Sequence, residues 1–203
     1  MKKILFYLLL MIPCCGFAQI GIKAGLNFAN VTNASSINNS SHTSYHAGVL
    51  FGSAFSKLLG FRTELMYSKQ GYDYTSGNSR GNVGLDYISS SDLVTVGITR
   101  YFQLQLGFQV AYLLNVKADS SNGIAELPGS YKKILDIANR LDYGFAGGIE
   151  IHPAGGLLVG ARINISLSNL YKNAASSQDA SFSGIDLKNN LFQLFLGWRF
   201  GKK

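Results

Sequence analysis

The chain has 203 residues, of which 47% are hydrophobic and only 14% are charged, and its formal net charge is +7. That length is typical of a single domain. The basic excess is small and forms no run of Lys or Arg, so nucleic acid is not an expected partner. Beyond the N-terminal segment no apolar stretch approaches the roughly 20 residues of a membrane-spanning helix, which excludes a helical membrane protein.

The N-terminal segment has the pattern of a secretory signal. A pair of lysines precedes an apolar run over residues 4–12, and the small residues Gly16 and Ala18 follow at the −3 and −1 positions of a cleavage site. The apolar run is too short to cross a membrane. We therefore predict a signal peptide at residues 1–18 and one domain at residues 19–203.

The only two cysteines are Cys14 and Cys15, and both leave with this peptide. The mature chain is then expected to contain no disulfide and no thiol ligand for a metal. A lipoprotein acylated at Cys14 or Cys15 is the alternative, although Pro13 or Cys14 directly before the acceptor fits that signal poorly.

After residue 19 the chain contains eight segments in which apolar residues alternate with polar or small ones. Alternation with period two places successive side chains on opposite faces of a strand. The segments span 20–28, 45–55, 61–72, 85–99, 104–112, 141–151, 157–167 and 190–200. Arms of roughly 9–11 residues are what a tilted strand needs to cross a bilayer.

Two stretches depart from simple alternation. In the fourth segment the apolar side shifts from Leu85 and Tyr87 to positions near Val94, which predicts a β-bulge within residues 89–92. In the longest connection, apolar spacing over residues 131–141 predicts one short helix.

The connections between the segments alternate between long and short. The long ones lie near residues 32–44, 73–84, 115–140 and 168–189. Outer-membrane barrels have short periplasmic turns at one end and long extracellular loops at the other. The even number of segments and this alternation predict an all-β fold, an eight-stranded antiparallel transmembrane β-barrel with an OmpA/OmpX-like up-and-down meander, in the bacterial outer membrane.

Aromatic residues gather near both ends of the segments, where amphipathic rings favour the membrane interface. Tyr101 and Trp198 belong to the expected periplasmic girdle, and Tyr45, Tyr87 and Tyr143 to the expected outer one.

The polar face of the barrel is expected to carry six charged side chains pointing inward. They are Lys23, Arg62, Glu64, Glu150, Arg162 and Arg199. The interior of an eight-stranded barrel is just wide enough to be filled by side chains. A structural network of salt bridges that plugs the lumen is the favoured interpretation, and a narrow polar path for ions is the alternative. We expect negligible single-channel conductance.

Catalytic, cofactor and metal sites find little support in the sequence. The triplet His42-Thr43-Ser44, expected in the first outer loop, is the one candidate for a lipid A-modifying enzyme, but such a triplet arises easily by chance in a Ser-rich loop. Three separated histidines and scattered aspartates do not predict a zinc or calcium site. No Gly-rich phosphate motif precedes a helix, so we expect no cofactor and no enzymatic activity.

Several segments together resemble a known family. They are IGIKAGLNFANV at 20–31, FRTELMYSKQG at 61–71, LGFQVAYLLNVK at 106–117, LDYGFAGGIEI at 141–151 and FLGWRF at 195–200. They resemble the PorT-like outer-membrane β-barrel family typical of Bacteroidetes. The resemblance implies the barrel and its final assembly strand, links the founding member to protein secretion and gliding-type machinery, and defines no active site. The SSSDLV segment departs from that family's usual Pro-containing segment.

We therefore expect a monomeric outer-membrane barrel, embedded in outer-membrane lipid, that presents four surface loops for binding, scaffolding or envelope integrity. An accessory part in protein secretion, with envelope or secretion-machinery proteins as partners, is the second hypothesis. A lipid A-modifying enzyme is the third.

Overall fold

The structure is a computed structural model, and it describes residues 19–32, 38–54, 58–76, 79–120, 139–169 and 188–200. These ranges form eight strands and contain no helix, hence none long and apolar enough to cross a membrane. The strands are β1 (Gln19–Thr32), β2 (Asn38–Ala54), β3 (Leu59–Ser76), β4 (Ser79–Gly97), β5 (Phe102–Ser120), β6 (Leu141–Ile151), β7 (Leu157–Ser166) and β8 (Lys188–Arg199).

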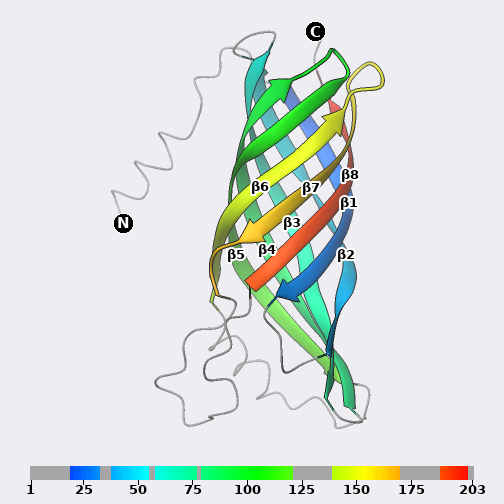
Figure 1. The fold of residues 1–203 in the computed structure, drawn as a ribbon, viewed down its shortest axis with the longest axis vertical. Helices are drawn as coiled ribbons and strands as arrows, with labels where there is room; N and C mark the ends of the chain where they lie inside the picture. The colour runs from blue at the N-terminus through cyan, green and yellow to red at the C-terminus, as the bar shows by residue number, and fades with distance from the viewer. Residues whose placement is uncertain are drawn as a thin grey trace, which may run out of the picture.

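Each strand pairs antiparallel with the next one in the sequence, and β8 pairs with β1 to close the barrel (Figure 1). Closure removes the free sheet edges that would otherwise leave backbone N–H and C=O groups without partners. The predicted eight-stranded antiparallel barrel with up-and-down order is confirmed.

Alternation sorts the side chains between the two faces of this closed sheet. Outward positions are apolar and exposed, and the most exposed are Leu106 and Phe108 on β5, at 63% each. Inward positions are buried and carry most of the polar residues, while Leu50, Leu93 and Leu158 add apolar volume inside. An apolar outer wall of this extent has to be covered by lipid or by protein.

One end of the barrel, here called the turn end, has short connections (top of Figure 1). Between β6 and β7 the chain reverses through Gly155 and Gly156, whose φ angles are +35° and +105°. Side chains rarely adopt such angles, and a Cβ on Gly156 would lie only 2.6 Å from the Arg199 carbonyl oxygen. Glycine is therefore required for this tight hairpin.

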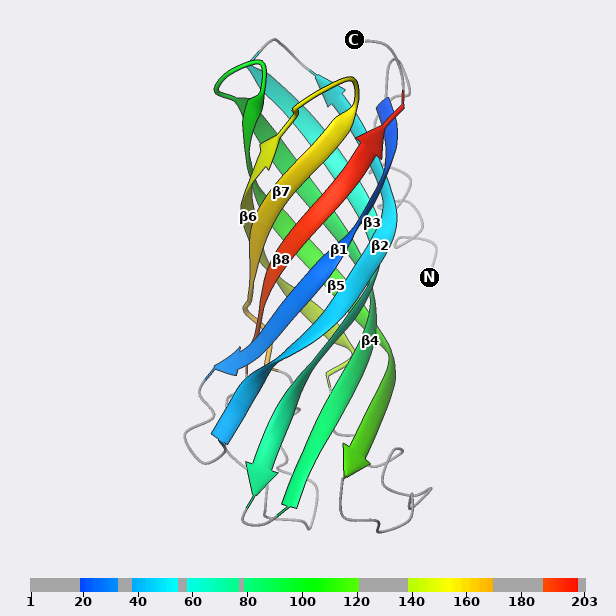
Figure 2. The same ribbon diagram turned by 90° about the vertical axis from the view of Figure 1, so that its right-hand side faces the viewer.

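At the opposite end, here called the loop end, β2 to β5 extend past the other strands (Figure 2). The β3–β4 ladder continues to Ser76 and Ser79, whereas β5 pairs with β6 only up to Tyr112 and Leu141. The predicted dozen-residue loop at 73–84 is therefore wrong. The backbone N–H and C=O groups of polar residues pair across a ladder just as those of apolar residues do. A strand can therefore continue where the alternation of apolar and polar residues stops.

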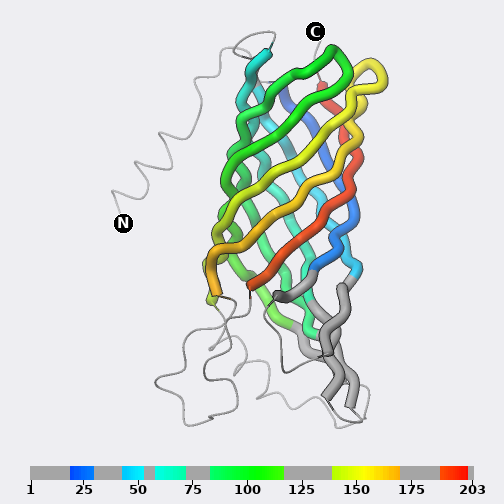
Figure 3. The backbone as a smooth tube through the Cα atoms, in the orientation of Figure 1, coloured from blue at the N-terminus to red at the C-terminus, as the bar shows by residue number. Residues whose placement is uncertain are grey.

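Two of the other predicted long loops are also shorter, whereas the one predicted at 168–189 agrees with the strand bounds, since β7 ends at Ser166 and β8 begins at Lys188. β1 and β2 leave only residues 33–37 between them, and β5 continues to Ser120 (backbone path in Figure 3). The helix predicted at 131–141 falls almost wholly outside the described residues, and Leu141 begins β6. The signal peptide predicted at residues 1–18 also lies outside them.

The predicted bulge within residues 89–92 is wrong. β3 and β4 pair in unbroken register along their whole length, and Ser89, Ser91 and Leu93 all point inward. The register of β4 against β5 shifts instead at Asp86/Tyr87, where β5 contributes one extra residue, Leu114. A second shift lies on β2 between Ser41 and His46.

Apolar residues switch from odd to even positions along β4 for a different reason. The barrel interior is more apolar near Leu85 and Tyr87 and more polar farther along the strand. Leu85 and Tyr87 are completely or nearly completely buried inside the barrel, beside Leu113 and Val116 of β5. Tyr87 therefore does not belong to the outer girdle predicted for it. Tyr45, Tyr143, Tyr101 and Trp198 do face outward and are exposed.

Candidate functional site

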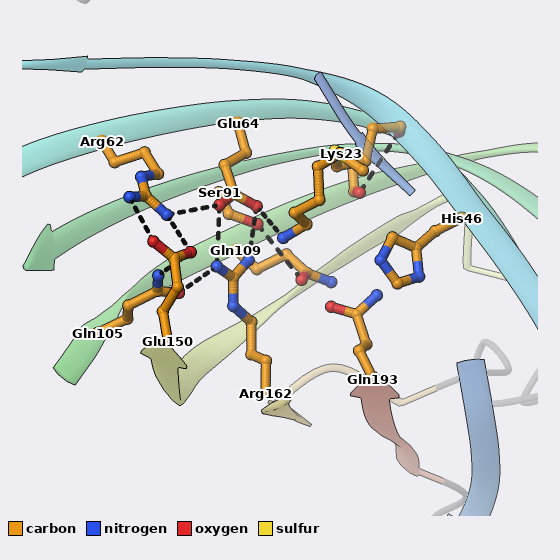
Figure 4. A network of polar contacts seen from close by, with 12 residues as sticks. Lys23, His46, Arg62, Glu64, Ser91, Gln105, Gln109, Glu150, Arg162 and Gln193 are labelled. Carbon is orange, nitrogen blue, oxygen red and sulfur yellow. Dashed lines mark hydrogen bonds and ion pairs between the residues drawn. The ribbon is translucent and has the colours of Figure 1, made fainter. Parts of the chain in front are cut away.

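Five inward charged side chains meet inside the barrel, and we call them the charge cluster. They are Lys23 of β1, Arg62 and Glu64 of β3, Glu150 of β6 and Arg162 of β7, and none is more than 3% exposed. Figure 4 shows them converging from strands that are far apart in the sequence. Period-two alternation positions each one, because all occupy the inward phase of their strands.

Glu64 is held by two cations. Lys23 Nζ lies 2.5 Å from Glu64 Oε2. The guanidinium of Arg162 binds the same carboxylate through both oxygens, with Nη1–Oε2 at 2.7 Å and Nη2–Oε1 at 2.9 Å. Two parallel hydrogen bonds of this kind are the strong form of the Arg–carboxylate pair.

Glu150 is bound in a similar way by Arg62, with Nη1–Oε2 at 2.5 Å and Nη2–Oε1 at 2.9 Å. Gln105 Nε2 also donates to Oε2 at 2.8 Å, and His152 Nε2 lies 2.6 Å from Oε1. Both oxygens of this buried carboxylate are therefore fully occupied.

The two carboxylate centres are joined to each other. Gln105 donates to Glu150 and accepts from Arg162 Nη2 at 2.5 Å, and Arg62 Nη1 lies 3.9 Å from Glu64 Oε1. The ring of Phe195 borders the cluster, with its centroid 4.2 Å from Lys23 Nζ. Such a continuous network holds strands β1, β3, β5, β6 and β7 in one arrangement.

The structure places the sixth predicted residue, Arg199, outside this cluster. β8 ends at Arg199, which is half-buried at the turn end, and among the described residues no carboxylate lies within ion-pair distance of it. Its backbone N–H donates to the Gly156 carbonyl at 2.8 Å. The sequence pattern predicted its inward phase but could not predict its distance from the acidic residues.

A second polar group lies beside the charge cluster, and we call it the amide chain. Asn27 Oδ1 lies 2.8 Å from His46 Nδ1 and accepts from Gln193 Nε2 at 2.9 Å. Gln193 Oε1 accepts from Asn164 Nδ2 at 3.0 Å, and Asn27 Nδ2 donates to Ser68 Oγ at 3.0 Å.

Sequence reasoning missed the amide chain, and also missed Gln105 and His152 as partners of Glu150. A signal was present for the strand residues, because all of them occupy the inward phase of their strands; His152 instead follows the end of β6. A neutral amide carries no charge from which a partner of opposite charge can be predicted. Its position in the alternation alone did not show that it forms hydrogen bonds inside the barrel.

Each carboxylate oxygen of the charge cluster accepts a hydrogen bond from a lysine or an arginine. Carboxylates bound in this way have no free oxygen to act as a base. Within the described ranges no three His, Cys, Asp or Glu side chains come together as metal ligands would.

The proposed His42–Ser44 enzyme site is not in a loop. Both residues belong to β2, and Ser44 Oγ donates to the Lys69 carbonyl at 2.6 Å. That hydrogen bond ties the hydroxyl to the backbone of β3. The side chain of His42 lies outside the described residues.

A closed barrel with an apolar outer wall and a packed polar interior is the architecture of a transmembrane β-barrel. The chain matches the family described as outer membrane protein beta-barrel domain over residues 14–172. It belongs to that family and is an outer-membrane β-barrel protein of the bacterial outer membrane. The turn end is then the periplasmic end and the loop end the extracellular one.

Solved structures of other barrels are similar to this one. Neisserial surface protein A (NspA) is 12% identical with a TM-score of 0.52, and the match covers 90% of this chain and 99% of NspA. Ail, the attachment invasion locus protein of Yersinia pestis, is 14% identical with a TM-score of 0.49, over 90% and 99% of the two chains. OprG from Pseudomonas aeruginosa is 12% identical with a TM-score of 0.45, over 91% and 97%. No curated protein matches the chain.

Proposed function

We propose that this protein is a non-conducting outer-membrane barrel that presents an extension of β2 to β5 and the adjoining loops for binding at the cell surface. The observation that carries the proposal is the contrast between the two halves of the molecule. The interior is filled by the charge cluster, whereas β2 to β5 continue at the loop end past the ends of the other four strands.

The filled interior argues against transport. Arg62, Glu64 and Arg162 bridge strands on different sides of the lumen, and Leu50 and Leu93 are buried beside them. An ion passing through would have to separate these pairs, and a buried charge left without its partner costs about 3–5 kcal/mol.

The extension supplies a surface for binding. The last pairing of β1 with β2 is Ala29 with His42, but β2 continues to Asn38 along β3. On the other side β5 continues to Ser120 along β4, beyond its pairing with β6. Both sides of this four-stranded sheet therefore end in strand edges that pair with neither β1 nor β6, and a partner chain could add a strand there.

The experiment shortens the extension and leaves the barrel intact. Gly71 and Gly84 are paired across β3 and β4, so residues 72–83 can be replaced by an Asn-Gly turn at that level. Full-length and shortened proteins are then isolated in mild detergent from outer membranes of a deletion strain that expresses each one. We expect proteins that co-purify with the full-length barrel to be lost from the shortened one.

The shortened variant must still be a folded barrel, which is checked by a gel mobility that changes on boiling. Co-purification of the same proteins with both variants, or with neither, would overturn surface binding through the extension. A stable nanosiemens-scale conductance of the purified full-length protein would overturn the non-conducting barrel.

An accessory role in protein secretion is the second proposal, and it rests on the segments that resemble the PorT-like family. Co-purified proteins that belong to secretion machinery, and secreted proteins retained in the deletion strain, would support this role. We do not propose an enzyme, because the Ser44 hydroxyl is bound to the Lys69 carbonyl. Replacement of His42 and Ser44 by Ala is expected to leave the lipid A profile unchanged.

A further inference from the structure

Along the described part of β4 two acidic side chains lie on the outer face of the barrel. Asp86, near the loop end, pairs with Lys69 of β3, whereas Asp92 stands among apolar neighbours without a cation among the described residues. Unbroken register along β4 directs Asp92 outward, between the exposed side chains of Val94 and Ile88. Ser90 lies on the same face, and Thr63 is the cross-strand neighbour of Asp92 on β3. Together these three short polar residues interrupt the apolar wall of β3 and β4.

The interruption lies deep in the membrane. Asp92 is five residues from Gly97, where β4 ends at the turn end. With a rise of about 3.3 Å per residue and a tilt of about 40°, it stands roughly 13 Å along the barrel axis. The apolar band of such barrels is about 25 Å tall, so Asp92 lies near its middle. Lipid headgroups do not reach that depth.

The hydrogen-bonding capacity of this group is not used up within the chain. Thr63 Oγ1 donates to Asp92 Oδ1 at 2.7 Å. Among the described residues no donor reaches Oδ2, and no hydrogen bond is formed by the Ser90 hydroxyl. Lipid tails offer neither donors nor acceptors, and ionisable side chains at this depth normally face protein.

The shape of the same wall is uneven. Phe108 is the cross-strand neighbour of Asp92 on β5 and projects with 63% of its surface exposed. The adjacent Thr63 and Ser90 are short. The Phe108 ring, which also contacts the Phe145 ring of β6 at 5.1 Å between centroids, therefore stands next to short polar side chains.

We propose that this wall, formed by Thr63, Ser90, Asp92 and Phe108, is an interface with a second copy of the same chain. Copies inserted in the same direction present equal depths to each other, and a two-fold axis along the membrane normal makes the contact self-complementary. Asp92 Oδ2 then accepts from a hydroxyl of the second copy, and Phe108 covers the short side chains opposite. Small and polar residues are the usual contacts between segments within membranes.

This dimer replaces the monomer expected from the sequence. The predicted bulge at residues 89–92 gave Asp92 no defined face, and only the continuous register of β4 places it against lipid. The dimer is independent of the surface binding proposed above.

The test uses cysteine crosslinking in native outer membranes. All cysteines of the chain precede residue 19, so a single Ser90→Cys substitution provides the reactive site. Leu194→Cys is the matched control, because Leu194 faces outward on β8, four strands away around the barrel. The unsubstituted protein reports any background.

A crosslinked species of twice the monomer mass is expected for Ser90→Cys and not for Leu194→Cys. Addition of Asp92→Leu should lower its yield about tenfold, since both symmetric hydrogen bonds are lost, whereas Asp92→Asn should retain it. Boiling-dependent gel mobility verifies that each variant is folded. The absence of a double-mass species, a species of another mass, or a yield unchanged by Asp92→Leu would overturn the proposal.

Discussion

The charged residues inside the barrel stabilise one another as ion pairs. Removing one partner of a pair leaves the other charge buried and unpaired, which costs several kcal/mol of folding free energy. The charge cluster contains three cations and two carboxylates, all nearly completely enclosed. Desolvation of these groups is compensated only because Glu64 and Glu150 accept hydrogen bonds at both oxygens. Removal of either carboxylate would leave cations buried without a counter-charge.

We predict that Glu64→Ala lowers the free energy of unfolding by about 3–5 kcal/mol, because Lys23 and Arg162 lose their shared partner. Urea unfolding in detergent, followed by the fluorescence of the single tryptophan, Trp198, measures this change. Lys69→Ala is the control. Lys69 and Asp86 form a partly exposed ion pair at 3.9 Å, and the loss of such a pair costs about 1 kcal/mol or less. Equal effects of the two substitutions would contradict the structural role of the charge cluster.

At the scale of strands, closure of the barrel depends on close backbone approach where β1 meets β8. A Cβ on Gly25 would lie 2.0 Å from the Leu194 carbonyl oxygen and 2.7 Å from Phe195 Cα. Backbone atoms cannot move aside as a flexible side chain can. Gly25 therefore lets the first and last strands pair at normal spacing.

We predict that Gly25→Ala destabilises the folded barrel by about 1–3 kcal/mol, as other overpacked positions do. Gly52→Ala on β2 is the matched control, because the nearest atom to its Cβ would be 3.5 Å away. The fraction of protein with folded gel mobility after graded heating measures both. A Gly52→Ala barrel that melts as early as the Gly25→Ala barrel would refute the argument from closure.

At the scale of the whole molecule, the same closed sheet separates two environments. Along the described strands the outer wall is mainly apolar, with the Thr63–Ser90–Asp92 group and the Lys69–Asp86 pair as polar interruptions, and the interior holds the charge cluster and the amide chain. The lumen of an eight-stranded barrel is filled by its own side chains, and here those side chains are bonded to one another across it.

We predict that the purified protein in planar bilayers shows no single-channel openings above baseline. The physical reason is that the Arg62–Glu150 and Arg162–Glu64 pairs would have to separate to admit an ion. Membrane insertion of the same purified preparation is verified separately by protease protection after reconstitution into vesicles. Reproducible openings on the nanosiemens scale would show that the lumen conducts.

The fold was predictable from sequence because strand alternation is local. Period two decides whether a residue such as Lys23 or Glu150 points inward, and the number and spacing of the segments decide that eight strands close. The extent of strands was less predictable. The extension of β3 and β4 to Ser76 and Ser79 depends on backbone pairing between neighbours, which leaves little trace in hydropathy.

By itself, then, the sequence determined the barrel, its apolar outer face and the inward phase of its charges. The tertiary structure alone decided which charges meet, because Glu64 and Arg162 are 98 residues apart and their contact depends on the register of every strand between them. It also decided that Arg199 lies apart from the cluster and that Asp92 faces the membrane. Each of these outcomes depends on hydrogen-bonded register, and register is a property of pairs of strands, not of any one strand.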